Sequence, residues 1–334
     1  MSDTMGETLG AGAPSTARPA VQSAPGPAAR LASRPSPQPL ALSFRDVSFA
    51  YGAAAGSGGN PVIDHLTWDV ATGCVTGLVG LNGCGKSTLL RLADGLVAPT
   101  AGEVLVRPPG AAPHVPAPAS GVGAVMGVAE AAARAPVPAV PAELVPLASM
   151  SSAQRARSVA LLMQIHRTPS MTVEDLVMCG RYTHMGAFGR ASAQDRRIVA
   201  DALQEVGVAD LAHKPARNLS GGQRQRAFIA MALAQQAQLL LLDEPVTFLD
   251  PRAARDVMAL VRRLVDERCL TVLAVLHDVD LALRTCDDVA VMQSGRIVDF
   301  GPVPEVLARG ALERVLDVRI ERHEGPCGES FSVF

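Results

Sequence analysis

The feature that most constrains this chain is a glycine-rich segment, Gly80 to Thr88, with the sequence Gly-Leu-Asn-Gly-Cys-Gly-Lys-Ser-Thr. It fits the pattern G-x-x-x-x-G-K-[ST], in which glycines let the backbone fold around an anion and point successive N–H groups at its oxygen atoms. Residues 75–79 are typical of a buried strand, and residues 87–96 carry leucines at helical spacing. A strand, a glycine loop and a helix in this order predict a phosphate site at the helix N-terminus.

The polar residues of this loop have predicted roles. Lys86 supplies a compact charge for the β- and γ-phosphates of a nucleotide, and the Ser87 hydroxyl is a candidate Mg²⁺ ligand. The chain has 30 lysines and arginines, but its only lysines are Lys86 and Lys214, which favours a specific need for an ammonium group at position 86. A chance glycine-rich turn is the alternative. The predicted nucleotide-binding residues of the loop are Gly80, Asn82, Gly83, Cys84, Gly85, Lys86, Ser87 and Thr88.

Composition excludes several other classes of protein. The formal net charge of −2 gives no reason to expect nucleic acid as a partner. The six cysteines are scattered without a C-x-x-C pair, which favours a reducing compartment and no structural metal. The apolar runs are of strand length, well below the eighteen or so residues that span a bilayer, so we expect a soluble chain with at most a peripheral membrane role.

The chain divides into segments by composition. Residues 1–40 are rich in alanine and proline and are predicted to be a disordered extension. Residues 108–147 have the same texture and are predicted to be a low-complexity insertion without much regular structure. We expect one ordered domain over 41–320, with a small helical subdomain at 165–218 and a frayed C-terminal tail at 321–334.

Two alternating segments precede the phosphate loop. Residues 42–49 and 62–70 read as half-buried antiparallel edge strands. Tyr51 follows the first of them and is either a ring that stacks on a purine base or an ordinary turn tyrosine. Further on, residues 158–163 are predicted to form a buried strand that ends at Gln164.

A second anion-binding segment is predicted at residues 219–223, Leu-Ser-Gly-Gly-Gln. Ser220 and Gln223 have the spacing of a helix capping box. Gly221 and Gly222 leave bare amides at the same helix N-terminus, where an anion can bind. The capping and anion-binding roles are compatible, and we expect both. Residues 172–175 and 192–195 also have capping-box spacing and predict two earlier helix starts.

Carboxylates follow a strand made of four leucines, residues 239–242. A strand apolar on both faces is expected to be central and parallel, and ligands bind at the carboxyl edge of such sheets. Asp243 suits the surroundings of Mg²⁺ and Glu244 suits a general base for water, although both could simply cap the strand. Strand 270–276 delivers His277 to the same edge, where we expect it to reach the γ-phosphate rather than serve as a structural histidine.

Together these segments resemble the ATP-binding subunit of an ABC transporter. The residues that carry the resemblance are Tyr51 (A-loop), Gly80–Thr88 (Walker A), Gln164 (Q-loop), Leu219–Gln223 (signature), Leu239–Glu244 (Walker B), Leu249 and Asp250 (D-loop) and His277 (H-loop). The resemblance implies an α/β P-loop NTPase core with a mixed sheet, an antiparallel β edge subdomain and an inserted helical subdomain. It also implies ATP hydrolysis with Mg²⁺. The implied catalytic residues are Glu244, His277, Gln164 and Lys86, with Ser87, Gln164 and Asp243 around the metal and Ser220–Gln223 and Asp250 contacting nucleotide.

A finer resemblance is to importers of iron(III)-siderophores, heme and cobalamin. It rests on residues 82–91, 173–181 and 277–282. Leu81, where proline is usual, and Val246, where threonine is usual, depart from that group's pattern, as does the insertion at 108–147. The implied cargo is an iron(III)-siderophore or related chelate, with heme or cobalamin as alternatives. An export ATPase and a soluble ABC protein without transport are more distant alternatives.

The resemblance also implies partners. Two copies would clamp two ATP molecules between one copy's Walker A loop and the other copy's signature segment, as a homodimer in the ATP-bound state. A membrane permease would contact the region near Gln164 and the helical subdomain, at the cytoplasmic face of the membrane. A substrate-binding protein would act indirectly.

Overall fold

The computed structural model describes residues 39–52, 61–110, 144–164, 168–185, 189–325 and 328–334. The predicted disordered extension, residues 1–40, lies outside the described residues except for its last two. Most of the predicted insertion at 108–147 also lies outside them. The predictions for the rest of these two segments therefore stay predictions.

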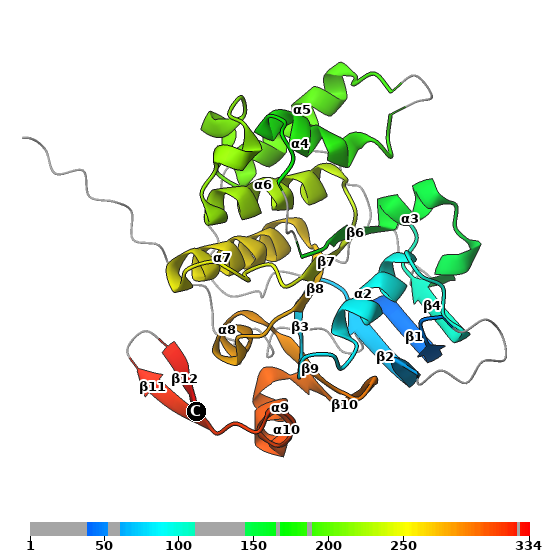
Figure 1. Cartoon of the computed structure of the whole chain (residues 1–334), viewed down its shortest axis with the longest axis vertical. Helices are drawn as coiled ribbons and strands as arrows, with labels where there is room; N and C mark the ends of the chain where they lie inside the picture. Colours follow the sequence, from blue (N-terminus) through cyan, green and yellow to red (C-terminus); the bar gives the residue numbers. More distant parts are fainter. Residues whose placement is uncertain (1–38, 53–60, 111–143, 165–167, 186–188, 326–327) are drawn as a thin grey trace, which may run out of the picture.

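A six-stranded mixed sheet forms the centre of the molecule (Figure 1). In spatial order its strands are β10 (Arg296–Pro302), β9 (Asp288–Gln293), β3 (Val75–Gly80), β8 (Thr271–Val275), β7 (Leu239–Asp243) and β6 (Val159–Leu162). All neighbours pair in parallel except β10, which is antiparallel to β9. All five residues of β7 are buried, because both of its faces are covered. The prediction of a central parallel strand is confirmed.

A second, antiparallel sheet lies beside the first (Figure 1). Its strands, in spatial order, are β2 (Ile63–Ala71), β1 (Leu40–Phe49), β4 (Ala101–Val106) and β5 (Val145–Pro146). Phe44 of β1 stacks on Trp68 of β2, with ring centroids 6.0 Å apart. Trp68 also meets Phe300 of β10 edge-on at 5.6 Å, which joins the two sheets. The predicted antiparallel strand pair is confirmed.

Helix α2 (Lys86–Asp94) fills the space between the two sheets (Figure 1). Its leucines Leu89, Leu90 and Leu92 are almost completely buried. They share one hydrophobic cluster with side chains of β1, β2 and β4 in the antiparallel sheet, and with Leu239 and Leu241 of β7. Because this helix follows the phosphate loop directly, the same packing that forms the core also fixes the position of the loop.

The other face of the central sheet is covered by helices. A second hydrophobic cluster lies between these helices and the sheet. Leu240 and Leu242 of β7 belong to it, because side chains along a strand alternate between the two faces of the sheet. A helical subdomain at the top of Figure 1 continues the cluster. Its helices are α4 (Val173–Met178), α5 (Ala193–Glu205) and α6 (Gly221–Ala234), with 3₁₀ turns η2 (Cys179–Arg181), η3 (Ala209–Leu211) and η4 (Ala216–Asn218). The helices below it are α7 (Pro251–Arg268), α8 (Val279–Thr285), α9 (Val303–Arg309) and α10 (Ala311–Leu316).

The helix starts in this subdomain follow the predicted capping residues. The Thr172 hydroxyl accepts the backbone N–H of Asp175 at the start of α4. Ser192 and Asp195 form a reciprocal capping box at the start of α5. Asp195 also forms a buried ion pair with Arg181, whose Nε lies 2.9 Å from the carboxylate.

The predicted strand before Gln164 is confirmed as β6 (Val159–Leu162), one residue shorter at each end than expected. A helix that was not predicted, α3 (Ser152–Ser158), comes directly before it. A capping box starts this helix: the Ser151 hydroxyl accepts from the N–H of Gln154, whose side chain accepts from the N–H of Ser151. The end of the expected insertion is also ordered, because β5 pairs with β4 and is followed by the 3₁₀ turn η1 (Leu147–Ser149).

The C-terminal residues differ from the predicted frayed tail. They form an antiparallel hairpin of β11 (Ile320–Gly325) and β12 (Gly328–Val333). Phe331 is 5% exposed and belongs to the main hydrophobic cluster, which explains why this segment is ordered. Two backbone hydrogen bonds between Arg319 and Phe334 close the base of the hairpin.

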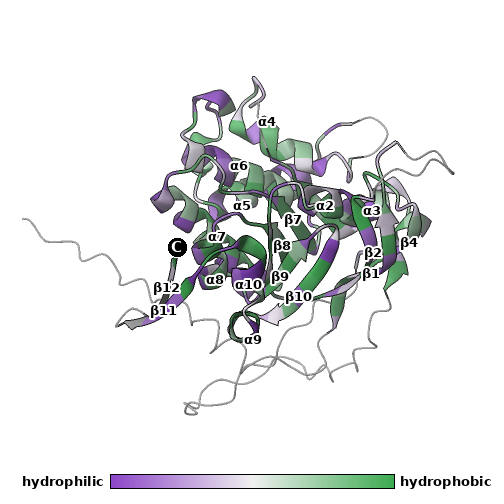
Figure 2. Ribbon diagram, turned by 60° about the horizontal axis from the view of Figure 1, so that its bottom comes forward, coloured by the Kyte–Doolittle hydropathy of each residue, from purple (hydrophilic) through white to green (hydrophobic). Residues whose placement is uncertain are grey.

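Apolar residues concentrate in the central strands, whereas the outer helices carry hydrophilic residues on their exposed faces (Figure 2). Within the described ranges, no helix combines the length and the hydropathy that a membrane span requires.

Candidate functional site

The phosphate loop connects β3 to α2 and needs glycine at specific positions. Gly83 and Gly85 have φ values of 78° and 110°, in the region that favours glycine. At Gly80 an added Cβ would lie 2.3 Å from the Met292 carbonyl oxygen, so the loop also packs too closely on β9 for a side chain. The backbone conformation that the sequence pattern predicted is therefore present.

Lys86 is held inside this loop. Its ammonium donates to the carbonyl oxygens of Gly80 and Leu81 over 2.8 and 3.0 Å, and its side chain is buried. Cys84 lies beside it, and burial raises the pKa of the Cys84 thiol although the charge of Lys86 opposes this. The thiol is therefore neutral and packs against the loop, so a contribution of Cys84 to phosphate binding falls to its backbone.

Ser87 and Asp243 meet at the carboxyl edge of the sheet. The Ser87 hydroxyl donates to the Asp243 carboxylate over 3.0 Å. Burial raises the pKa of Asp243, while the hydrogen bond from Ser87 opposes the rise, so a cation here would stabilise the charged carboxylate. Hydroxyl and carboxylate oxygens suit Mg²⁺.

The Mg²⁺ site would need further ligands. Across the described part of the chain, no group of three or more histidine, cysteine or acidic side chains gathers to hold a metal. Mg²⁺ commonly keeps waters and takes phosphate oxygens, so two protein oxygens beside a phosphate loop fit it. The predicted site at Ser87 and Asp243 is chemically consistent with this donor set.

Glu244 follows Asp243 and is the centre of a hydrogen-bonded group. Gln164 Nε2 donates to Glu244 Oε2 over 2.7 Å, and His277 Nε2 donates to Glu244 Oε1. Thr247 Oγ1 donates to Oε2 over 3.0 Å. The backbone of Glu244 has a φ of 53°, a left-handed conformation that turns its side chain out of the strand direction. The structure thus brings three predicted catalytic residues, Gln164, Glu244 and His277, into direct contact.

The electrostatics of this group favour an ionised base. Burial would raise the pKa of Glu244, but the hydrogen bonds from His277 and Thr247 and the positive charge of Lys86 outweigh it, and the net pKa lies below the ordinary value. The carboxylate is therefore charged at neutral pH and can accept a proton from water. Thr247 contacts Glu244 directly and was not predicted as a site residue. Its position three residues after Glu244, in the turn that follows the strand, was the available signal.

Tyr51 lies over the start of α2. Its hydroxyl lies 3.2 Å from Thr88 Oγ1 and accepts a hydrogen bond from Arg91 over 3.3 Å. Its ring makes an edge contact with Phe49 at 4.9 Å and is 52% exposed. The ring thus stands beside the phosphate loop with free surface, as base stacking requires. Stacking on a purine stays a prediction.

The second predicted anion-binding segment opens α6. Ser220 and Gln223 form the expected reciprocal capping box. The glycines leave the helix end bare beside a hollow of about 400 Å³. Asp250 also borders this hollow and caps α7 by accepting the N–H groups of Arg252 and Ala253. Residues of the phosphate loop do not line the hollow, so the two predicted anion-binding segments lie at separate places on the chain.

An exposed aromatic residue stands at the rim of that hollow. Phe248 is 84% exposed and has a φ of 66°, so its backbone holds the ring out toward solvent. The sequence reasoning used its neighbours Leu249 and Asp250 and missed Phe248. An aromatic side chain in a turn beside the signature segment was the signal that could have identified it.

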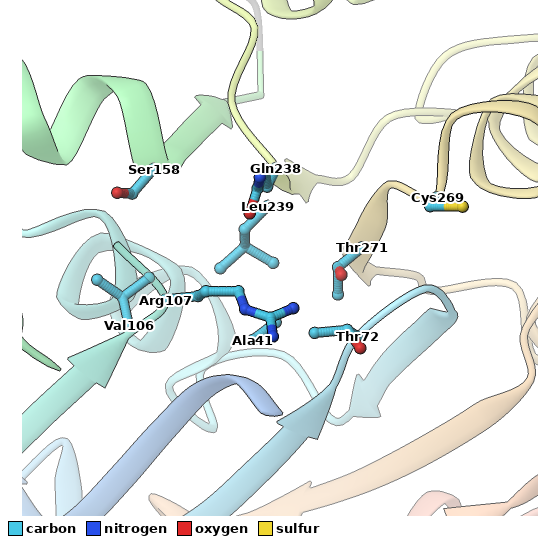
Figure 3. A pocket seen from close by; sticks show the side chains of 9 residues that line it. All are labelled: Ala41, Thr72, Val106, Arg107, Ser158, Gln238, Leu239, Cys269 and Thr271. Carbon is cyan, nitrogen blue, oxygen red and sulfur yellow. The ribbon is translucent and has the colours of Figure 1, made fainter. Parts of the chain in front are cut away.

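A different hollow lies at the opposite edge of the sheet (Figure 3). Arg107 crosses it, and its Nε has no hydrogen-bond partner, like the hydroxyls of Thr72 and Ser158. It borders the amino ends of β7 and β8, whereas Asp243, Glu244 and His277 follow the carboxyl ends of those strands. The hollow and the predicted site residues therefore lie at opposite ends of these strands.

The fold and the site together define an ATP-binding P-loop ATPase. The family model described as "ABC transporter" matches residues 63–247, more than half of the chain. The chain belongs to this family.

Curated relatives and solved structures agree with this assignment. The chain is 35% identical to the iron(3+)-hydroxamate import ATP-binding protein FhuC of Bacillus subtilis (strain 168), over 80% of this chain and 86% of FhuC. It is also 35% identical to the ferric enterobactin transport ATP-binding protein FepC of Escherichia coli (strain K12), over 79% of this chain and 84% of FepC. The fold resembles that of an ABC transporter assigned to the metal-chelate type and solved in an inward-facing conformation, with a TM-score of 0.67 at 23% identity, over 88% of this chain and 96% of that one.

Proposed function

We propose that this chain is the ATP-hydrolysing subunit of an ABC importer for an iron(III)-siderophore or a related chelate. The observation that carries the hydrolytic part is the Glu244 carboxylate, held by Gln164, Thr247 and His277 beside the Ser87–Asp243 pair. The import part rests on similarity to FhuC and FepC, whose names specify import of a hydroxamate and transport of enterobactin. Heme or cobalamin import is the alternative. A cobalamin import ATP-binding protein is 36% identical, although this chain spans only 56% of its length.

The proposed reaction is in-line transfer of the γ-phosphoryl group of ATP to water. Glu244 takes a proton from water as the water oxygen forms a bond to the γ-phosphorus, the bond to the bridging oxygen breaks, and ADP leaves. Ser87, with Asp243 and Gln164, would hold Mg²⁺, which would neutralise charge on the phosphate oxygens. Lys86 and the loop amides bind the phosphate oxygens, and His277 orients the base and reaches the γ-phosphate.

A second copy of the chain is the proposed partner in the ATP-bound state. Each chain has a phosphate loop and a separate bare helix end at Ser220, and a two-fold arrangement would let each copy complete the other's site. The exposed ring of Phe248 at the rim of the Ser220 hollow supports this, because burying it would be favourable. Tyr51 would stack on the adenine base, and Asp250 would lie at the contact between copies.

Membrane permease subunits are the further proposed partners. Import ATP-binding subunits act together with permeases, so we place this chain at the cytoplasmic face of the cell membrane as a peripheral protein. Met163 is 49% exposed next to Gln164, and Tyr182 in the helical subdomain is 64% exposed. These side chains suit contact with a permease helix near Gln164. A substrate-binding protein would act indirectly, through the permease.

The test of the hydrolytic assignment is Glu244→Gln. The amide keeps the shape of the side chain and can still contact its neighbours, but it cannot take a proton from water. We expect ATP binding to be retained while steady-state hydrolysis falls by about a hundred-fold or more. Hydrolysis equal to that of the wild type would remove Glu244 as the base. The import assignment is tested separately, by growth of a deletion strain on single iron chelates, and growth equal to the parent on every chelate would contradict it.

A further inference from the structure

The C-terminal hairpin lies against the helix that follows His277. Strand β12 packs on α8, which begins directly after His277 and is capped by Asp278, whose carboxylate accepts the N–H of Leu281. Phe331 of β12 belongs to the same hydrophobic cluster as Leu281, Ala282 and Leu283. Arg284 of α8 donates a 3.5 Å hydrogen bond to the Phe331 carbonyl oxygen. The hairpin and α8 are therefore joined by both apolar packing and a polar contact.

On its other side α8 packs on β3, the strand that leads into the phosphate loop. A Cβ added at Gly77 of β3 would lie 2.8 Å from Cys286 Sγ and 3.8 Å from the Ala282 methyl group. The C-terminal end of α8 therefore packs closely on β3 at position 77, where glycine leaves room for the Cys286 side chain. Because α8 packs on β3, on α7 and on the hairpin, removal of the hairpin would free one of the surfaces that fix it.

The N-terminal end of α8 sets where His277 stands. His277 follows Leu276, whose N–H donates to the Leu78 carbonyl oxygen of β3, and precedes Asp278 at the helix cap. Its side chain is 39% exposed, and its imidazole is hydrogen-bonded to Glu244. The hydrogen bond to Glu244 thus depends on the position of the backbone from which His277 projects.

We propose that the C-terminal hairpin positions His277 against Glu244, with Phe331 as the positioning residue. Phe331 packs α8 onto β3 and so fixes the turn that carries the imidazole. A residue remote from the reacting groups acts on turnover through their geometry. Misplacing a reacting group by about 1 Å can lower the rate by up to a hundred-fold. The phosphate loop follows the same carboxyl end of β3, but it packs on Met292 of β9 and on residues 62–63, so we expect nucleotide binding not to need the hairpin. This inference goes beyond the proposed ATPase activity but rests on it.

The test is Phe331→Ala in the full-length protein, with Phe334→Ala as the matched control on the same hairpin, because Phe334 is 72% exposed. We expect Phe331→Ala to lower kcat for ATP about ten-fold while its Kd for ATP stays at the wild-type value. Phe331→Leu, which keeps an apolar side chain, should recover most of the loss. Phe334→Ala should match the wild type. The near-ultraviolet spectrum and fluorescence of Trp68, the single tryptophan, report whether each variant is folded.

A double-variant comparison separates positioning from general destabilisation. In a His277→Ala background, measured by single-turnover hydrolysis, Phe331→Ala should cause no further loss, because it acts through the missing imidazole. The proposal is overturned if kcat of Phe331→Ala equals that of the wild type, if its ATP affinity falls in proportion to kcat, or if the full loss persists without His277. Absence of hydrolysis by the wild-type protein would instead refute the proposed function itself.

Discussion

The hydrogen bond from Thr247 to Glu244 gives a quantitative prediction about pH dependence. Thr247→Val removes the hydroxyl that donates to Glu244 Oε2 over 3.0 Å and leaves a side chain of similar size. A hydrogen bond to a charged group contributes about 1.5–3 kcal/mol, and one pKa unit corresponds to about 1.4 kcal/mol. Gln164 still donates to the same oxygen in the variant. The loss of free energy should therefore be at the lower end of this range, and we expect the pKa of Glu244 to rise.

The direction of the effect on activity follows from the role of the base. Glu244 acts as a base only when ionised, and its pKa in the wild type lies below the ordinary value. Activity is thus present above that pKa and lost as the pH falls through it. Raising the pKa moves the acid limb of the profile to higher pH, so the variant loses activity first under mildly acidic conditions.

The assay is kcat/KM for Mg·ATP as a function of pH, since this ratio reports the ionisation of the free enzyme. Comparison with the wild type cancels the titration of the nucleotide itself. Thr247→Ser keeps a hydroxyl at the same position and should retain the wild-type acid limb. Coincident acid limbs for the wild type and Thr247→Val would refute either the hydrogen bond or the assignment of Glu244 as the base.

Three further predictions test the loop, the core and the contact between copies. Lys86→Ala removes the ammonium held by the Gly80 and Leu81 carbonyls and should lose most ATP affinity in equilibrium dialysis; undiminished binding would discredit the phosphate loop. Leu90→Ala leaves a cavity between the two sheets and should lower the free energy of unfolding by about 2–5 kcal/mol. The assay is urea denaturation followed by Trp68 fluorescence, and a loss under about 1 kcal/mol would contradict the packing of α2. Phe248→Ala should weaken ATP-dependent self-association without changing monomer stability, and equal association would exclude this ring from the contact.

Much of the site could be predicted because parallel strands end at one edge of a sheet. Asp243 and Glu244 follow β7 and His277 follows β8, so their convergence depends only on the strand pattern and on the positions just after it. The glycine loop was equally predictable, since its backbone conformation requires glycine at specific positions. These parts of the account needed no information about long-range packing.

The missed features depend on tertiary contacts or on a local signal that was overlooked. Half of residues 320–333 are polar, and the buried ring of Phe331 orders the hairpin only because it packs on α8. The left-handed conformations of Glu244 and Phe248 belong to non-glycine residues, for which sequence gives little warning. The helix α3 was different, because Ser151 and Gln154 have capping-box spacing and could have been recognised.

The central claim is that ATP joins two copies of this chain, with the phosphate loop of each facing the Ser220 helix end of the other. The most direct measurement is the mass in solution of Glu244→Gln, by light scattering, with and without Mg·ATP. The account predicts one 34.7 kDa chain without nucleotide and twice that mass with it, and a return to the single-chain mass when Ser220→Glu places a negative charge at the helix end. A single-chain mass at saturating, bound ATP would contradict the account.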